Sequence, residues 1–91
     1  MSRPCKQRRI RGKPNSSYFK PAGVRTVDLE EVILTSSEFE ALRLKDVENL
    51  DQTDCANKME ISQSTFHRIL LSARQKTADA IVTGKAIHIK E

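Results

Sequence analysis

The amino-acid sequence predicts a mainly α-helical fold: a three-helix core that contains a helix-turn-helix, with a basic N-terminal arm and short β elements at its ends. Two observations support this prediction. Apolar side chains recur at three- and four-residue spacing from Phe66 to Ile81, the pattern of one buried helical face. Residue types that cap helices stand at the ends of the predicted helices. A chain of 91 residues suits one small domain.

Residues 1–23 form a predicted N-terminal arm, and residues 24–91 form the predicted domain. The arm contains all three prolines and two of the three glycines, which disfavour helix. Residues 1–20 carry seven basic and no acidic side chains, whereas residues 21–91 carry nine basic and twelve acidic ones. The positive charge therefore belongs to the arm, which suggests contact with a polyanion, the alternative being a solvated arm without a partner.

The first elements expected after the arm are a short strand and a helix. Val32–Leu34 is a short apolar run typical of a strand, and Thr35 with Glu38 forms a capping-box signature. We therefore expect a helix over about residues 36–48. Its expected buried face consists of Phe39 and Leu42, with Ala41 and Val47 as further candidates.

Two further helices follow. The second is short, opens at Asp51 or Gln52 and runs to about Met59. Ser62 is placed to cap a third helix, which can run to about Thr83. The apolar stripe of this third helix consists of Phe66, Ile69, Leu70, Ala73, Thr77, Ala80 and Ile81.

A last short strand is predicted after the third helix. Gly84 suits a left-handed C-terminal cap, and residues 86–90 alternate between apolar and polar types. This strand could pair with residues 32–34 within the chain or across a dimer, and the sequence leaves both arrangements open. Tyr18 and Phe19, at the end of the arm, could pack on the domain or stack on a ligand.

Residues 52–69 carry the predicted helix-turn-helix. Ala56 is small where two steeply packed helices would cross, and Met59 and Ile61 are apolar anchors on the two sides of a tight turn. The outward face of the third helix then stays free near its N-terminus, where base-reading side chains belong. Two side chains spaced three apart would bury the third helix on the second, Phe66 and Ile69.

This stretch, QTDCANKMEISQSTFHRIL, resembles the helix-turn-helix of phage Cro and repressor proteins and region four of sigma factors. Nearly the whole chain resembles the uncharacterised family called domain of unknown function 134, small bacterial and archaeal proteins predicted to bind DNA. The matching segments are SRPCKQRRI, LTSSEFEALRLKDVENLDQTDCANKMEISQSTFHRIL and GKAIHI. The resemblance implies a DNA-binding role.

Two departures from these patterns concern the turn and the arm. Glu60 stands where the turn commonly has Gly, because the backbone often becomes left-handed there, and the cost for another residue is on the order of 1 kcal/mol. Arg11 and Gly12 stand near positions at which family members often carry further cysteines. A complete cysteine metal site is therefore not predicted for the arm.

The resemblance to the helix-turn-helix implies a set of candidate DNA-binding residues, position by position. Amide and guanidinium groups suit the edges of adenine and guanine, and a helix N-terminus favours a phosphate oxygen. The expected base readers are Gln63, Ser64, Thr65, His67 and Arg68, with Ser62 at a phosphate. The residues expected to touch the DNA backbone, or only solvent, are Arg74 and Lys76. The arm residues expected in a minor groove or along phosphates are Arg3, Lys6, Arg8, Arg9 and Arg11.

These features predict a transcription regulator that binds specific double-stranded DNA as a homodimer, with half-sites about 34 Å apart. The alternative is a protein-interaction module that contacts RNA polymerase or a regulator. No catalytic set is visible, so no enzyme activity and no cofactor are predicted. The N-terminus does not resemble a signal peptide and no apolar run reaches membrane length, so a cytoplasmic location is expected.

The remaining polar residues have simpler interpretations. Cys55 is expected to pack inside the second helix, whereas a metal or redox role for Cys5 stays open. His88 alternates with isoleucines and is expected to face solvent. The residues expected to form the solvated face of the first two helices are Glu38, Glu40, Asp46, Glu48, Asp51 and Asp54.

Overall fold

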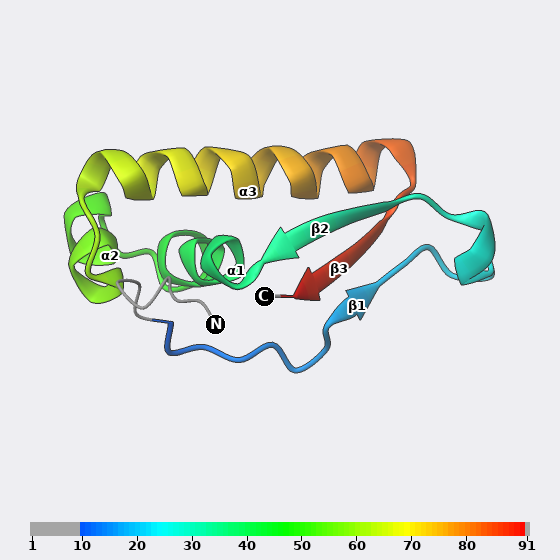
Figure 1. Ribbon diagram of the computed structural model, residues 1–91, viewed down its shortest axis with the longest axis horizontal. Helices are drawn as coiled ribbons and strands as arrows, with labels where there is room; N and C mark the ends of the chain where they lie inside the picture. The colour runs from blue at the N-terminus through cyan, green and yellow to red at the C-terminus, as the bar shows by residue number, and fades with distance from the viewer. Residues whose placement is uncertain (1–9, 91) are drawn as a thin grey trace, which may run out of the picture.

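The structure is a computed structural model, and it describes residues 10–90. Figure 1 shows the long helix α3 along one side of the molecule, α1 and the sheet beneath it, and α2 at one end. In chain order the elements are β1 (Tyr18–Phe19), the 3-10 turn η2 (Thr26–Asp28), β2 (Glu31–Thr35), α1 (Ser36–Leu42), the π-helical turn η3 (Arg43–Val47), α2 (Gln52–Met59), α3 (Gln63–Thr83) and β3 (Ala86–Lys90).

The capping box at the start of α1 is confirmed. The Thr35 side chain accepts from the Glu38 amide at 3.2 Å, and the Glu38 carboxylate accepts from the Thr35 amide at 2.9 Å. The helix predicted to reach residue 48 does so, but from Arg43 onward it is π-helical, and the Glu48 amide donates to the Arg43 carbonyl at 3.0 Å. Asn49, with φ of 61°, turns the chain toward α2.

The connection between α2 and α3 is three residues long. The Asp51 side chain caps α2, and Glu60 ends it in the left-handed conformation, with φ of 59° and ψ of 45°. The Ile61 amide donates to the Ala56 carbonyl at 3.0 Å, which satisfies one of the last carbonyls of α2. Ser62 then caps α3 by accepting from the Thr65 amide at 3.1 Å. The expected left-handed turn at position 60 is confirmed.

The three strands form one sheet in the order β1-β3-β2. β3 runs parallel to β2, with Val32 opposite Ile87, and antiparallel to β1, with Tyr18 opposite His88. The strand predicted at residues 86–90 therefore pairs within the chain. The three helices form the crossover that joins the two parallel strands, as parallel pairing requires. The pairing of β1 shows that Tyr18 and Phe19 pack onto the domain as part of its sheet.

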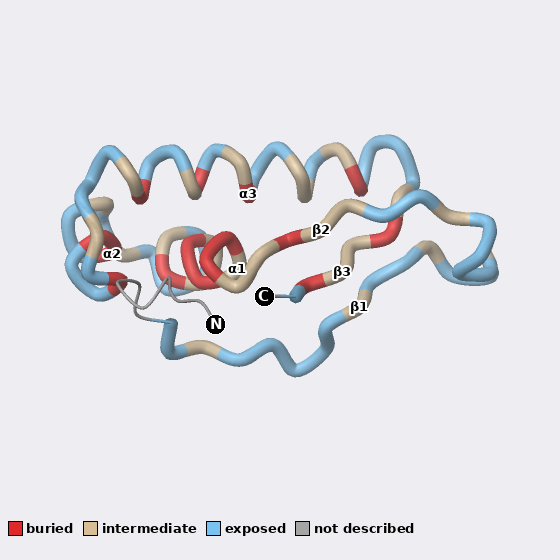
Figure 2. Tube along the Cα trace, in the orientation of Figure 1, coloured by how far each residue is buried: buried red, intermediate tan, exposed pale blue. Residues whose placement is uncertain are grey.

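The core consists of two adjoining clusters beneath α3, and Figure 2 shows the buried residues on the side of α3 that faces α1 and the sheet. The larger cluster lies between α1, η3, α2 and α3 and the smaller between α3 and the sheet. The fully buried members of the larger cluster are Ala41, Leu44, Cys55, Ala56, Met59, Phe66 and Leu70. The smaller cluster comprises Leu34, Ala73 and Ile89.

Two expected core residues are exposed instead. Val47 is 73% and Ile81 is 74% exposed, so the prediction that they belong to a buried face is wrong. Both side chains line shallow surface grooves instead of the core. At these points of η3 and α3 nothing in the described part of the chain covers the helical face, so periodicity alone overestimates burial.

Candidate nucleic-acid interface

The first two turns of α3 bring four of the expected base readers onto one face. Gln63, Ser64, His67 and Arg68 are all exposed, and their spacing places them on the side of α3 away from the core. Thr65 differs because it is half-buried, and its amide and its hydroxyl are both bonded to Ser62. The outward face of these two turns therefore carries four polar side chains, and the exposed Leu71 follows them one turn further along α3.

The inner face of the same two turns is held rigidly. Phe66 and Leu70 are completely buried against a cluster that includes Ala56 and Met59 of α2. Cys55 is also completely buried in this cluster, as expected, and burial raises the pKa of its thiol. The outward side chains thus stand on a helix whose position is set by packing on α2.

The N-terminal end of α3 can attract an anion. The first turn of α3 contains no acidic residue, and the unpaired amides of a helix start carry partial positive charge. The Ser62 hydroxyl is already engaged, since it accepts from the Thr65 amide and lies 2.9 Å from the Thr65 hydroxyl. A phosphate at this end would therefore meet backbone amides before it meets the Ser62 side chain.

Arg74 and Lys76, farther along α3, do not join this face. The Arg74 guanidinium forms a fork with Asp46, with Nε–Oδ2 and Nη2–Oδ1 distances of 3.0 and 2.5 Å, and this pairing lowers the pKa of Asp46. The Lys76 ammonium donates to the Ile33 carbonyl at 2.8 Å and to Glu38 at 2.9 Å. Of the two alternatives expected for Lys76, contact with DNA backbone or with solvent only, the second is wrong, because the ammonium closes an internal network.

Glu38 is buried, so its assignment to a solvated acidic face is wrong. Its side chain accepts from the Thr35 amide, from the Ser72 hydroxyl at 2.5 Å and from Lys76. Burial alone raises the pKa of a carboxyl group, but these hydrogen bonds and the Lys76 charge outweigh it, and the pKa of Glu38 is lowered. Glu38 therefore ties the start of α1 to the middle of α3.

Glu40 is also buried, with 1% of the residue exposed, and it is wrongly assigned for the same reason. Its carboxylate accepts from the Arg43 guanidinium and from the backbone amides of Arg11 and Gly12. Desolvation raises its pKa, and these donors together bring the pKa below the usual value. The other four acidic residues of the set, Asp46, Glu48, Asp51 and Asp54, are exposed as expected.

The lowered pKa values of Glu38 and Glu40 predict acid-sensitive stability. Both groups bind protons more weakly in the folded chain than in the unfolded chain, so their contribution is present above the ordinary carboxyl pKa of 4.5 and is lost as pH falls through the lowered folded pKa. We expect the free energy of unfolding in urea to fall below about pH 4.5. In the double variant Glu38→Gln and Glu40→Gln, this fall should be shallower.

The control for this experiment is Glu30→Gln. The Glu30 side chain is 80% exposed and lies 3.7 Å from Lys85, so its removal should leave the pH profile of stability unchanged. A double variant with the same acid slope as the parent protein would contradict the assigned role of the two buried carboxylates.

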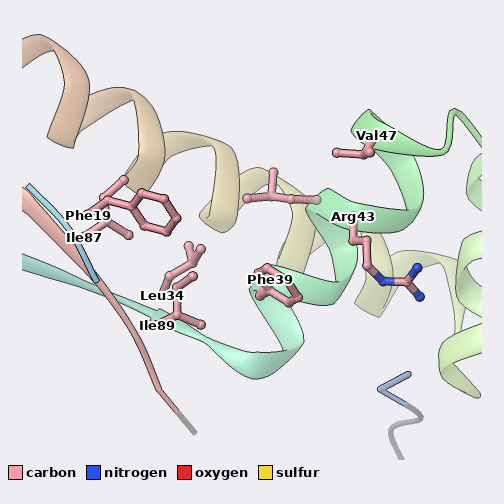
Figure 3. Close-up of a pocket in the computed structure, with 8 residues that line it drawn as sticks. Phe19, Leu34, Phe39, Arg43, Val47, Ile87 and Ile89 are labelled. Atoms are coloured by element: carbon pink, nitrogen blue, oxygen red, sulfur yellow. The ribbon is translucent and has the colours of Figure 1, made fainter. Parts of the chain in front are cut away.

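An apolar groove of about 350 Å³ opens between the sheet and α1 (Figure 3). The Arg43 guanidinium points away from the apolar side chains in this view. Sequence periodicity did not find this groove, because it combines side chains from β1, β2, α1, η3 and β3. Its labelled apolar lining consists of Phe19, Leu34, Phe39, Val47, Ile87 and Ile89.

The opposite face of the sheet carries a polar cluster around His88. The His88 ring meets Tyr18 edge-on with centroids 5.1 Å apart, and its Nδ1 lies 3.7 Å from a Glu31 oxygen. The Tyr18 hydroxyl donates to Glu31. His88 is therefore half-buried beside these two partners, whereas the sequence predicts a solvent-facing residue.

Several expected features fall on residues 1–9. Arg3, Lys6, Arg8, Arg9 and Cys5 lie outside the described residues. Arg11 is described, and it is exposed while its backbone amide is bonded to Glu40. Over residues 10–90, no helix combines the length and the apolar character of a membrane span.

Comparison with known proteins identifies relatives over nearly the whole chain. The UPF0251 protein of Caldanaerobacter subterraneus subsp. tengcongensis is 57% identical over 90 residues, which cover 99% of this chain and 76% of the relative. UPF0251 proteins of two Thermoanaerobacter strains, Thermoanaerobacter sp. and Thermoanaerobacter pseudethanolicus, are each 56% identical over 99% of this chain, and the match covers 80% and 76% of their lengths. No solved structure matches. A family described as protein of unknown function DUF134 matches residues 1–91, and the chain belongs to this family, whose relatives carry the name UPF0251.

Proposed function

We propose that the protein is a sequence-specific DNA-binding transcription regulator, in which α2 and α3 form a helix-turn-helix and α3 enters the major groove. The observation that carries this proposal is the outward face of α3, where Gln63, Ser64, His67 and Arg68 stand together while the opposite face is buried. A rigid helix with polar side chains near its N-terminus is what major-groove reading requires.

The chemistry of these side chains matches the edges of base pairs. The Gln63 amide can form two hydrogen bonds with adenine, and the Arg68 guanidinium can form two with guanine. The amides at the start of α3 suit a phosphate oxygen, which would fix the register of the helix on the duplex. Specificity in this arrangement depends on Gln63 and Arg68, with Ser64 and His67 beside them.

The arm supplies affinity that does not depend on sequence. Its net charge of +7 over residues 1–20 lies on a chain whose remaining residues are net negative. Lysine and arginine side chains at phosphates release condensed counterions, and this release drives much of non-specific DNA binding. In the proposed homodimer, two such arms and two α3 helices would bind half-sites about 34 Å apart.

The alternative function is a protein-interaction module that contacts RNA polymerase or a regulator. Ile81 and Val82 favour it, since these neighbouring apolar side chains at the end of α3 are both exposed, and adjoining exposed apolar groups are typical of contact surfaces. The two functions differ in one measurable respect, which is whether the protein selects particular DNA sequences.

Selection of bound sequences from a random DNA pool at physiological salt tests the proposal. We expect enrichment of one sequence with two-fold symmetry, because a symmetric dimer presents two identical reading helices. A pool that stays random after repeated rounds would overturn the proposed function and favour the protein partner.

Replacement of Arg68 by alanine should weaken specific binding by about 1–3 kcal/mol, because one bidentate base contact is lost. The measurement is fluorescence anisotropy with the selected duplex and with a version mutated at the contacted base pair. Arg25→Ala is the matched control, since Arg25 is 79% exposed, lies outside the helices and pairs only with nearby Asp28 among the described contacts. Equal affinity of the Arg68→Ala variant and the parent protein would show that Arg68 does not contact a base.

A further inference from the structure

We propose that Glu40 is a positioning residue for DNA binding, and that its buried carboxylate anchors the basic arm to α1 at Arg11 and Gly12. This inference rests on the proposed function, because it assigns a role in that function to a residue that does not touch DNA. In the free protein, Glu40 fastens the arm to the domain at one defined point.

The anchor consists of four hydrogen bonds to the Glu40 carboxylate. The Arg43 guanidinium donates from Nε to Oε1 of Glu40 at 2.9 Å and from Nη2 to Oε2 at 2.8 Å. The Arg11 and Gly12 amides each donate to one oxygen of the same carboxylate, both at 3.1 Å. Arg43 also bonds Glu48 through Nη1 at 2.5 Å. The carboxylate thus has two donors on each oxygen.

The buried Glu40 carboxylate needs hydrogen-bond donors, and this need explains why the arm docks here. A carboxylate removed from water is costly unless its oxygens receive several donors, and a single arginine satisfies only part of that need. The missing donors come from amides 28 and 29 residues away along the chain. If the arm left this site, Glu40 would keep the Arg43 pair and lose half of its hydrogen bonds. The docked arm and the buried charge therefore stabilise each other.

Gly12 allows the close approach that these contacts need. A Cβ atom at this position would overlap Nε and Cδ of Arg43 and would lie 3.0 Å from Oε1 of Glu40. Any larger residue at position 12 would have to displace the guanidinium from its fork with Glu40. Glycine at this position is thus a requirement of the anchor rather than of a turn.

The anchor also fixes the point of the domain to which residues 1–10 are attached. Figure 1 shows the start of the described arm near the end of the molecule that carries α2 and the first turn of α3. Arg3 stands eight residues before Arg11, and a segment of that length spans at most about 29 Å. This span exceeds the shortest extent of the molecule, 21 Å, so the arm is long enough to pass the edge of the domain.

Without the anchor, the first attachment point of the arm would be β1. Arg3 stands fifteen residues before Tyr18 but only eight before Arg11, so its tether to the domain would be nearly twice as long. The effective concentration of a tethered group falls roughly as the −3/2 power of tether length, which gives a loss of about two- to threefold from length alone. The direction in which the arm leaves the domain would also be lost.

Gly12→Ala tests this inference in the full chain. We expect the variant to bind the selected DNA duplex about two- to tenfold more weakly than the parent protein. Asn15→Ala, at an exposed position of the same arm, should leave affinity unchanged. In an arm-neutral background with alanine at Arg3, Lys6, Arg8 and Arg9, Gly12→Ala should have no further effect, because residues 1–10, which the anchor tethers to the domain, then carry no charged side chain. Equal weakening in both backgrounds would mean a general structural defect and would overturn the positioning role.

Hydrogen exchange in the free protein separates the anchor from the DNA-binding function. We expect the Arg11 and Gly12 amides to exchange slowly in the parent protein and rapidly in Glu40→Gln, while amides in the middle of α3 stay protected in both. If the two arm amides exchange equally fast in both proteins, the anchor does not exist, whatever the DNA result. Slow exchange in a protein that binds no DNA would support the anchor and overturn its proposed role together with the proposed function.

Discussion

Replacement of Phe66 by alanine is expected to lower the free energy of unfolding by about 3–5 kcal/mol. Phe66 is the largest of the completely buried side chains, and it lies in the cluster that joins α1, η3, α2 and α3. Its truncation removes buried apolar surface and leaves a cavity that the surrounding helices can fill only in part. Small domains are commonly stable by only about 5–15 kcal/mol, so a substantial fraction of this stability would be lost.

Urea denaturation followed by circular dichroism measures this effect. His67→Ala is the matched control, because His67 neighbours Phe66 in sequence but points outward, and surface substitutions usually change stability by less than about 0.5 kcal/mol. A loss below about 1 kcal/mol for Phe66→Ala would contradict the packing of α3 on α2.

Removal of the arm charges is expected to weaken the salt dependence of DNA binding. Each phosphate contact contributes about 0.9 to the slope of log affinity against log salt concentration. If the four side chains each meet a phosphate, the arm-neutral variant should lose about 3.6 from this slope. Between about 50 and 200 mM salt, the affinity of the parent protein should then fall about 100-fold more than that of the variant. The arm-neutral variant carries alanine at Arg3, Lys6, Arg8 and Arg9.

Salt titrations of both proteins on one duplex provide the measurement. Arg25 and Lys90 are exposed basic residues of the domain, and their replacement by alanine gives a control for total charge. If the slope per removed charge is the same for the domain variants as for the arm variant, the arm has no special role at the phosphates.

The local elements could be predicted from the sequence because their signals are local. The capping box of Thr35 and Glu38, the Ser62 cap and the left-handed Gly84 each depend on residues within four positions. The same holds for the polar outward face of α3, since exposure follows from helical spacing once the buried stripe is known. Its contact with DNA remains a prediction, because exposure does not identify a ligand.

The buried carboxylates could not be predicted in the same way. Glu38 is buried because Ser72 and Lys76 reach it from α3, and Glu40 is buried because the arm returns to it. These partners are 28 to 38 residues away, and nothing in a local acidic pattern distinguishes such residues from solvated ones. The capping box indicates a local hydrogen-bond partner for Glu38, since it places this carboxylate at a helix start, but it does not indicate burial, and Glu40 has no such signal.

The short strand β1 and the ion pair of Arg74 with Asp46 also could not be predicted from neighbouring residues. A strand of two residues has no periodicity, and Tyr18–Phe19 becomes a strand only because β3 offers it an edge. Arg74 has the charge of a phosphate contact, yet Asp46 lies across from it on η3. In both cases the partner comes from a distant part of the chain.

The central position of β3 determines the order in which the sheet can form. β1 and β2 do not pair with each other, because each pairs only with β3. Neither of them therefore has a strand partner until Ala86–Lys90 joins the sheet. The segment that closes the sheet thus also holds Tyr18–Phe19 on the domain, and loss of β3 would leave both of its neighbours without a strand partner.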